Sequence, residues 1–169
     1  MTSREHRNVQ LRPELVEPDL QRLHSAAVRN PHGPEDRLLR VTLNALAAIK
    51  SGAPSTHSLE YMPTYPDLSD CETSYIGTDP NTRPSHRLVW RERVPEDPRE
   101  PAVREIIALG ERDNGQVYHL AGQRLGRPVG FTLDQLAELR EPVHTAQPDV
   151  SHHHGLNSPA QDAEVEPQL

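Results

Sequence analysis

The sequence predicts an α+β fold in which a helix hairpin packs on a small antiparallel sheet, followed by C-terminal helices and a disordered tail. Two amphipathic helical patterns open the chain, and short alternating segments follow between turn-rich joins. Only 34% of the 169 residues are hydrophobic and 4% are aromatic, below the roughly 45–50% apolar content of globular chains. The core is therefore expected to use only part of the chain.

The first part of the chain predicts a short strand and two helices. Residues 8–11 are typical of a strand, and a helix follows from about Pro18, with apolar residues at helical spacing. After a break at 30–34, a second helix opens with proline and two acids and closes at Ser51-Gly52. Two short helices with a tight connection predict an antiparallel hairpin.

Strand segments follow a loop over 52–66. They cover about 72–76, 86–91 and 103–109, separated by the turn-rich joins 77–84 and 95–101. In 86–91, alternation places Arg87, Val89 and Arg91 on one face and Leu88 and Trp90 on the other. We therefore expect one face of the sheet to pack on the hairpin, with Trp90 in the core, and the other to face a ligand or partner.

The chain closes with two helices and a polar segment. One helix is predicted over 116–125, and the next starts at Thr132, which has capping-box spacing to Gln135. Residues 143–169 contain four acids, no Lys or Arg and no apolar periodicity, so we expect a disordered acidic tail. The predicted division is a domain over 8–127, an appended helix over 128–142 and the tail over 143–169.

Composition excludes several classes of protein. The net charge of −7 argues against a broad non-specific nucleic-acid binder, whose domain pI is typically above about 9. One cysteine, Cys71, excludes an internal disulfide framework and is expected to be a small packed residue. We expect no cofactor and no metal site, and we interpret the three histidines at 152–154 as a solvated polar run. The longest apolar run is too short for a membrane helix, so we expect no membrane contact and a cytoplasmic location.

The most specific pattern lies in the second half of the chain. An arginine opens an apolar strand in His86-Arg87-Leu88-Val89-Trp90. A second apolar strand, from Ile106, continues through Gly110-Glu111-Arg112 into a helix that carries Val117-Tyr118. These segments resemble the RelE/ParE toxin superfamily, whose members carry a "YRLVY" strand and then "VGxR" with "VY" shortly after. The resemblance covers roughly 8–127 and is strongest over 86–125.

The resemblance implies a toxin of a type II toxin–antitoxin pair. Some members cleave mRNA on the ribosome without a metal ion. For these members, the resemblance implies that the residues matching Arg87, Arg112 and Tyr118 belong to the active site. It also implies a cognate antitoxin protein that holds the toxin inactive, with mRNA on the ribosome as the second partner.

The chemistry of metal-free RNA cleavage agrees with these residue types. The enzyme must remove a 2′ proton, stabilise a dianionic phosphorane and protonate the leaving oxygen. Guanidinium groups stay protonated and bind phosphate bidentately, and a tyrosine ring can stack on a base. We further expect RNA contacts from three other arginines: Arg83, Arg91 and Arg124.

Alternatives remain open from the sequence. The segment 71–75 has no lysine where the family's ribonucleases usually carry lysines, and His86, His119 or Glu111 are candidates to replace the missing base. The alternative function is a non-nuclease protein of the same fold that binds a protein target, as a ParE-like topoisomerase inhibitor or partner-binding module. The site residues have structural alternatives too: a surface ion pair of Arg112 with a neighbouring acid, a solvated strand face for Arg87 and Arg91, and a half-buried Tyr118.

Overall fold

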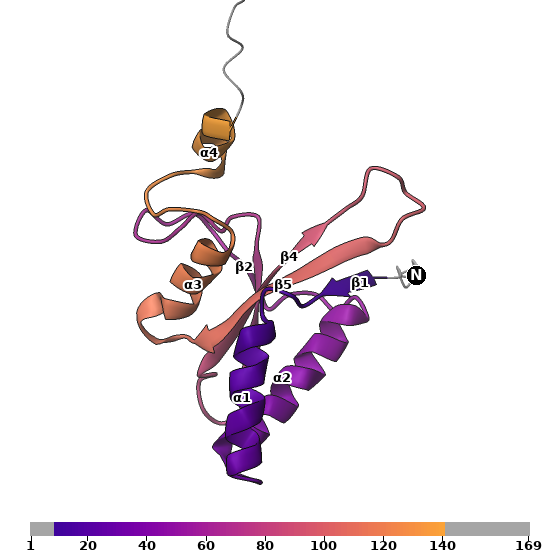
Figure 1. Ribbon diagram of the computed structural model, residues 1–169, viewed down its shortest axis with the longest axis vertical. Coiled ribbons are helices and arrows are strands. Elements are labelled where there is room, and N and C mark those ends of the chain that lie inside the picture. Colours follow the sequence, from indigo (N-terminus) through magenta and orange to yellow (C-terminus); the bar gives the residue numbers. More distant parts are fainter. Residues whose placement is uncertain (1–8, 141–169) are drawn as a thin grey trace, which may run out of the picture.

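The computed structural model describes residues 9–140, which form four helices and five strands (Figure 1). The strands are β1 (Val9–Arg12), β2 (His57–Ser58), β3 (Glu72–Ile76), β4 (His86–Arg93) and β5 (Ala102–Glu111). The helices are α1 (Glu17–Arg29), α2 (Pro34–Lys50), α3 (Gln116–Arg124) and α4 (Leu133–Arg140), with a 3-10 turn, η1 (Asp113–Gly115), before α3. The predicted α+β class is confirmed.

The strands form one mixed sheet in the order β1-β5-β4-β3-β2. The pairs β5–β4, β4–β3 and β3–β2 are antiparallel, as expected, but β1 pairs parallel to β5. The prediction of a purely antiparallel sheet is therefore wrong at its first strand. Side-chain alternation sets which residues share a face, but it does not specify the direction of the neighbouring strand.

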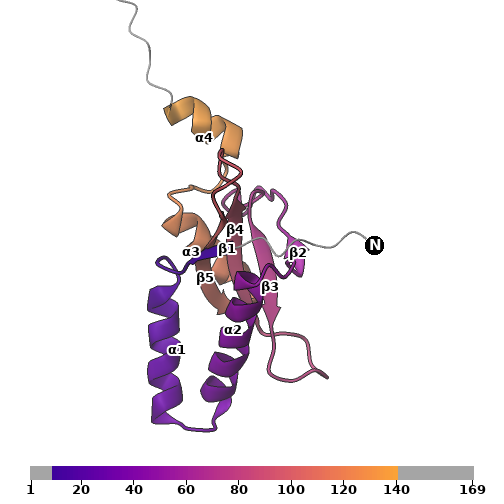
Figure 2. The same cartoon turned by 90° about the vertical axis from the view of Figure 1, so that its right-hand side faces the viewer.

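The α1–α2 hairpin covers one face of the sheet, which we call the hairpin face. Figure 2 shows the two helices running side by side, joined by a short loop. Apolar side chains from both helices and from β3, β4 and β5 form a single buried cluster there. Its buried members are Val16, Leu46, Ile49, Ile76, Leu88, Trp90, Ile106 and Leu109. The expectation that Trp90 belongs to the core is confirmed, since its side chain is buried in this cluster.

The opposite face, which we call the α3 face, is also covered over much of its area. Val89, Ile107 and Ala108 pack there against Val117 of α3 and Leu68 of the segment before β3. A bulge explains why two consecutive β5 residues share this cluster. Val89 pairs with Ala108 and Trp90 with Ile106, so that Ile107 is the extra residue. The expectation of an open second face is therefore wrong in this region.

The last helix begins as predicted. The Thr132 N–H donates to the Gln135 side chain at 2.9 Å, and the Gln135 N–H donates to Thr132 Oγ1 at 3.3 Å, so the capping box is confirmed. The Leu133 N–H also donates to the Asp67 carboxylate. Figure 1 shows α4 at the end of the molecule away from the α1–α2 hairpin.

The predicted acidic tail over 143–169, with its three histidines, lies outside residues 9–140, which are the residues that the structure describes. None of the described helices has the length and apolar character needed to cross a membrane. Within the same range, no three His, Cys, Asp or Glu side chains come together in a way that would hold a metal ion.

Candidate functional site

The backbone brings Arg87, Arg112 and Tyr118 to one end of the sheet. Arg87 on β4 lies opposite Gly110 on β5. Arg112 follows β5 directly, and its N–H donates to the Ser85 carbonyl at 2.8 Å, just before β4. Tyr118 lies in the first turn of α3, and a Cβ placed on Gly110 would lie 3.2 Å from Val117 Cβ in that same turn. The backbones of the three residues predicted for the active site therefore lie close together at one end of the sheet.

Arg87 is buried and makes contacts inside the protein. Only 4% of the residue is exposed, and its guanidinium carbon lies 3.6 Å from the centroid of the Tyr75 ring. Its Nη1 donates to the carbonyls of His86, at 2.9 Å, and Pro84, at 3.2 Å. These contacts hold in place the end of the loop that connects β3 to β4. Arg87 is therefore not part of a solvated polar strand face.

Arg112 and Arg83 differ from Arg87, because their side chains have no ion-pair or hydrogen-bond partner among residues 9–140. Within residues 9–140, the Arg112 side chain forms no ion pair with either of its acidic neighbours, Glu111 and Asp113. The geometry therefore gives no support to the surface-ion-pair alternative for Arg112. Arg83 is exposed in the join between β3 and β4. These two guanidinium groups remain available to a ligand.

Arg124 forms a partly buried ion pair with Asp19, which connects α3 to α1. Its guanidinium donates to both Asp19 oxygens at 2.6 and 2.8 Å and to the Ile107 carbonyl at 2.8 Å. The Asp19 carboxylate also accepts the Leu109 N–H and a hydrogen bond from Arg22. Burial raises the pKa of Asp19, but the hydrogen bonds from Arg124 and the Leu109 N–H outweigh it and hold the pKa below its ordinary value of 3.8.

β1 pairs only with residues 102–105 of β5, so the backbone of β5 beyond them has no strand partner on that edge within the described part of the chain. The Asp19–Arg124 pair provides hydrogen-bond partners for that backbone, at the Ile107 carbonyl and the Leu109 N–H. This position gives Arg124 a structural role. The geometry offers no support for the predicted RNA contact of Arg124.

Arg91 belongs to a second ion-pair network, which holds the segment before β3 on the sheet. Arg91 Nε lies 2.6 Å from Glu105, and its Nη1 lies 3.5 Å from Asp70. Arg127, beyond α3, donates to Asp70 at 2.6 and 2.7 Å and to the Asp67 carbonyl. Although burial raises the pKa of Asp70, the hydrogen bonds and charge of Arg127 lower it to about 2. The Arg91 guanidinium is therefore paired with carboxylates of the protein itself.

Cys71 lies next to this network and is buried, as expected for a small packed residue. Burial, together with the neighbouring Asp70 carboxylate, raises the pKa of its thiol to about 12, although the charges of Arg127 and Arg91 act in the opposite direction. The thiol therefore stays protonated at neutral pH.

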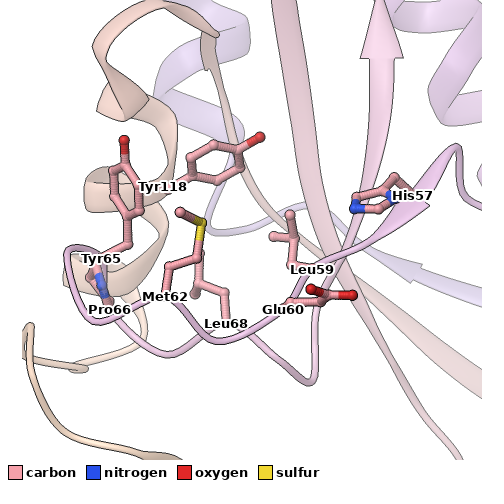
Figure 3. Close-up of a pocket in the computed structure, with 8 residues that line it drawn as sticks. All are labelled: His57, Leu59, Glu60, Met62, Tyr65, Pro66, Leu68 and Tyr118. Carbon is pink, nitrogen blue, oxygen red and sulfur yellow. The ribbon is translucent and has the colours of Figure 1, made fainter.

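Tyr118 lines a pocket of about 220 Å³, which we call the tyrosine pocket (Figure 3). The rings of Tyr118 and Tyr65 are nearly perpendicular, with an interplanar angle of 71° and centroids 5.7 Å apart. Tyr118 also packs on the apolar cluster of the α3 face, as the half-buried alternative proposes. The whole lining comprises His57, Leu59, Glu60, Met62, Tyr65, Pro66, Leu68 and Tyr118.

Two glycines let the 57–68 segment approach α3 closely. A Cβ at Gly115 would overlap the Tyr65 ring, and Gly115 also has a positive φ of 63°. A Cβ at Gly122, inside α3, would overlap Pro66. From the sequence, residues 52–66 are expected to form only a loop, and Tyr65 has no predicted role. A glycine in a helix interior, where it costs about 1 kcal/mol relative to alanine, is a signal of such a close approach.

Comparison with known proteins gives no assignment, since no protein-family model, no curated protein and no solved structure matches this chain.

Proposed function

We propose that this chain is the toxin of a type II toxin–antitoxin pair, with a RelE/ParE-like domain over 9–127. The order of elements supports the proposal, because a helix hairpin, a set of antiparallel strands and a helix follow one another, and this order resembles that of the RelE/ParE superfamily. The observation that carries it is that the backbones of Arg87, Arg112 and Tyr118 come to one end of the sheet, although the three residues belong to β4, to the turn after β5 and to α3.

Cleavage of mRNA is the first form of this function. Arg112 would contact the phosphate, Tyr118 would stack on a base, and Arg87, held by backbone carbonyls and Tyr75, would position the end of the sheet. His86 is a candidate general base. Burial lowers its pKa below the ordinary 6.5 against the opposing charge of Glu111, so the imidazole is neutral at neutral pH, as a base must be.

Binding of a protein target without RNA cleavage is the second form, and a specific observation favours it. Arg87, Arg91 and Arg124 all make contacts inside the protein. A dianionic phosphorane needs several cations aimed at it, and the predicted set leaves only Arg112 and Arg83 for that task. We therefore conclude that a toxin acting through a protein target is the function supported best, with mRNA cleavage as the second candidate.

Inducible expression in a bacterial host tests both forms. The wild type would be compared with Arg112→Ala/Tyr118→Ala and with Arg29→Ala, an exposed control at the end of α1. Growth and mRNA 5′ ends would be followed after induction. For the protein-target form, we expect the wild type and the control to arrest growth without new 5′ ends, and the double variant to lose the arrest.

Two other outcomes would change the conclusion. New 5′ ends that vanish in the double variant would establish mRNA cleavage in place of protein binding. Normal growth with a soluble, folded wild type would contradict the toxin proposal itself.

A further inference from the structure

The tyrosine pocket combines aromatic, apolar and acidic side chains. Tyr65 and Tyr118 present one ring face and one ring edge to each other, and Figure 3 shows Met62 beside both rings. Met62 is 53% exposed, although it is apolar. Glu60 lines the same pocket on the 57–68 segment. An exposed apolar side chain, two aromatic rings and a carboxylate together favour a ligand that has both an apolar stem and a positive charge.

The charge of the surrounding segment points the same way. Residues 51–76, which supply seven of the eight lining residues, contain four carboxylates and no lysine or arginine. Three of the carboxylates are engaged: Asp70 by arginines, Asp67 by backbone N–H groups, and Glu72 by two serine hydroxyls. Within residues 9–140, Glu60 is the carboxylate of this segment that forms no ion pair and accepts no hydrogen bond.

The Glu60 carboxylate, unpaired among the described residues, therefore opposes binding of an anionic ligand such as an RNA phosphate in this pocket. It favours a cation, and Glu60 is the group placed to meet it.

We propose that the tyrosine pocket binds an arginine side chain of a protein partner. A guanidinium stacks on an aromatic ring and donates to a carboxylate in one plane, which suits Tyr118 or Tyr65 together with Glu60. The aliphatic part of the arginine would lie against Met62 and Leu59. The protein already uses the same stacking inside the fold, where the Arg87 guanidinium lies 3.6 Å from the centroid of the Tyr75 ring.

This inference deepens the protein-binding form of the proposed function, because it names the side chain that the partner contributes. It rests on that function for its biological meaning only. The binding itself is measured on the isolated full-length chain, so its failure and the failure of the toxin proposal are distinguishable.

The experiment uses the two methionines of the chain, Met1 and Met62. Labelling with [methyl-¹³C]methionine gives one NMR signal at the pocket and one far along the chain as an internal reference. Three probes are titrated: N-acetyl-arginine methylamide, its neutral citrulline analogue and adenosine monophosphate. We expect the arginine derivative to shift the Met62 signal saturably, and the citrulline analogue to bind about fivefold more weakly, as loss of a cation–π contact of about 1 kcal/mol predicts.

A matched pair of variants tests the role of Glu60. Glu60→Gln removes the charge but keeps the shape, and we expect it to weaken binding of the arginine derivative by about threefold to tenfold. Glu96→Gln, in the exposed join between β4 and β5, is the control that should leave binding unchanged. An unchanged Met62 signal in the unliganded Glu60→Gln protein would show that the pocket keeps its structure.

Three results would overturn the proposal. The citrulline analogue could bind as tightly as the arginine derivative, which would remove the role of charge. Adenosine monophosphate could shift Met62 more strongly than the cation, which would indicate a nucleotide pocket and strengthen the RNA-cleaving form of the function. Equal affinities for Glu60→Gln and the wild type would remove the carboxylate from the recognition.

Discussion

The two faces of the sheet are covered in different ways. On the hairpin face, eight buried apolar residues from α2, from three strands and from the position just before α1 form one cluster, against which partly buried residues of both helices pack. On the α3 face, a nine-residue helix and the irregular segment before β3 supply the cover, and ion pairs and close backbone contacts fasten them. The hairpin face therefore stabilises the domain mainly by apolar burial, whereas the α3 face uses polar contacts to shape a pocket.

The difference follows from the elements available to each face. Two amphipathic helices of 13 and 17 residues present long apolar stripes, which need no specific polar contact to stay on the sheet. The irregular segment has no repeating stripe, so its position depends on individual contacts: Arg127 with Asp70, Pro66 on Gly122, and Tyr65 on Gly115. Such a surface is well suited to place pocket side chains, because each contact fixes a particular residue.

The largest expected effect comes from two adjacent isoleucines on opposite faces. Ile106 and Ile107 are both completely buried, the first in the hairpin-face cluster and the second in the α3-face cluster. We expect Ile106→Ala and Ile107→Ala each to lower the free energy of unfolding by about 2–5 kcal/mol. The loss should be larger for Ile106→Ala, because the cavity that the substitution leaves in the larger cluster cannot collapse. Denaturant unfolding measures both. A larger loss for Ile107→Ala would show that apolar burial contributes more to stability on the α3 face than on the hairpin face.

A smaller effect is expected where Pro66 packs on α3. In an ordinary helix interior, glycine to alanine stabilises by about 1 kcal/mol, but a Cβ at Gly122 would overlap Pro66. We therefore expect Gly122→Ala to destabilise the protein by about 1–2 kcal/mol and to shift the Met62 methyl signal. Gln123→Ala, at the exposed neighbouring position, serves as the control. A stabilised Gly122→Ala protein with an unmoved Met62 signal would show that this contact does not shape the pocket.

The smallest effect concerns the ion pairs of the α3 face. The pKa of Asp70 is about 2 in the folded protein, below the ordinary 3.8, so the ionised form stabilises the fold. This contribution is fully present above about pH 5 and is lost as the pH falls toward about 2. Because the Asp70 side chain is 37% exposed, solvent screens part of it.

Unfolding measured across this pH range would test the effect of Asp70. We expect Asp70→Asn to flatten the acid dependence of stability without removing it, because Asp19 and Asp67 also have lowered pKa values. An identical pH dependence in the variant and the wild type would show that the Asp70–Arg127 pair is not coupled to folding.

Periodicity and turn residues predicted most of the elements. The bounds of α2 and β3 agree with their patterns, and the capping box at Thr132 and Gln135 forms as expected. These features depend on residues close together in sequence, whose spacing determines the local hydrogen bonds and the apolar stripe. The same local reasoning placed Trp90 in the core.

The candidate site was predicted only in part. The motif placed Arg87, Arg112 and Tyr118 near one another, but it did not show that Tyr75 and two carbonyls already hold the Arg87 guanidinium. The partners of Arg124 and Arg127 lie 105 and 57 residues away, on α1 and in the segment before β3. A charged residue carries no local signal of a partner so distant in sequence, so its internal role was not predictable.

Local sequence patterns are sufficient to predict which segments become helices and strands and which of their sides are apolar, because those properties repeat at fixed spacings. The parallel pairing of β1 with β5, the burial of Arg87, the ion pair of Arg124 with Asp19 and the formation of the tyrosine pocket arise only in the folded protein. Each of these joins parts of the chain that are distant in sequence. Their positions depend on packing and charge pairing across the folded sheet, which no single segment encodes.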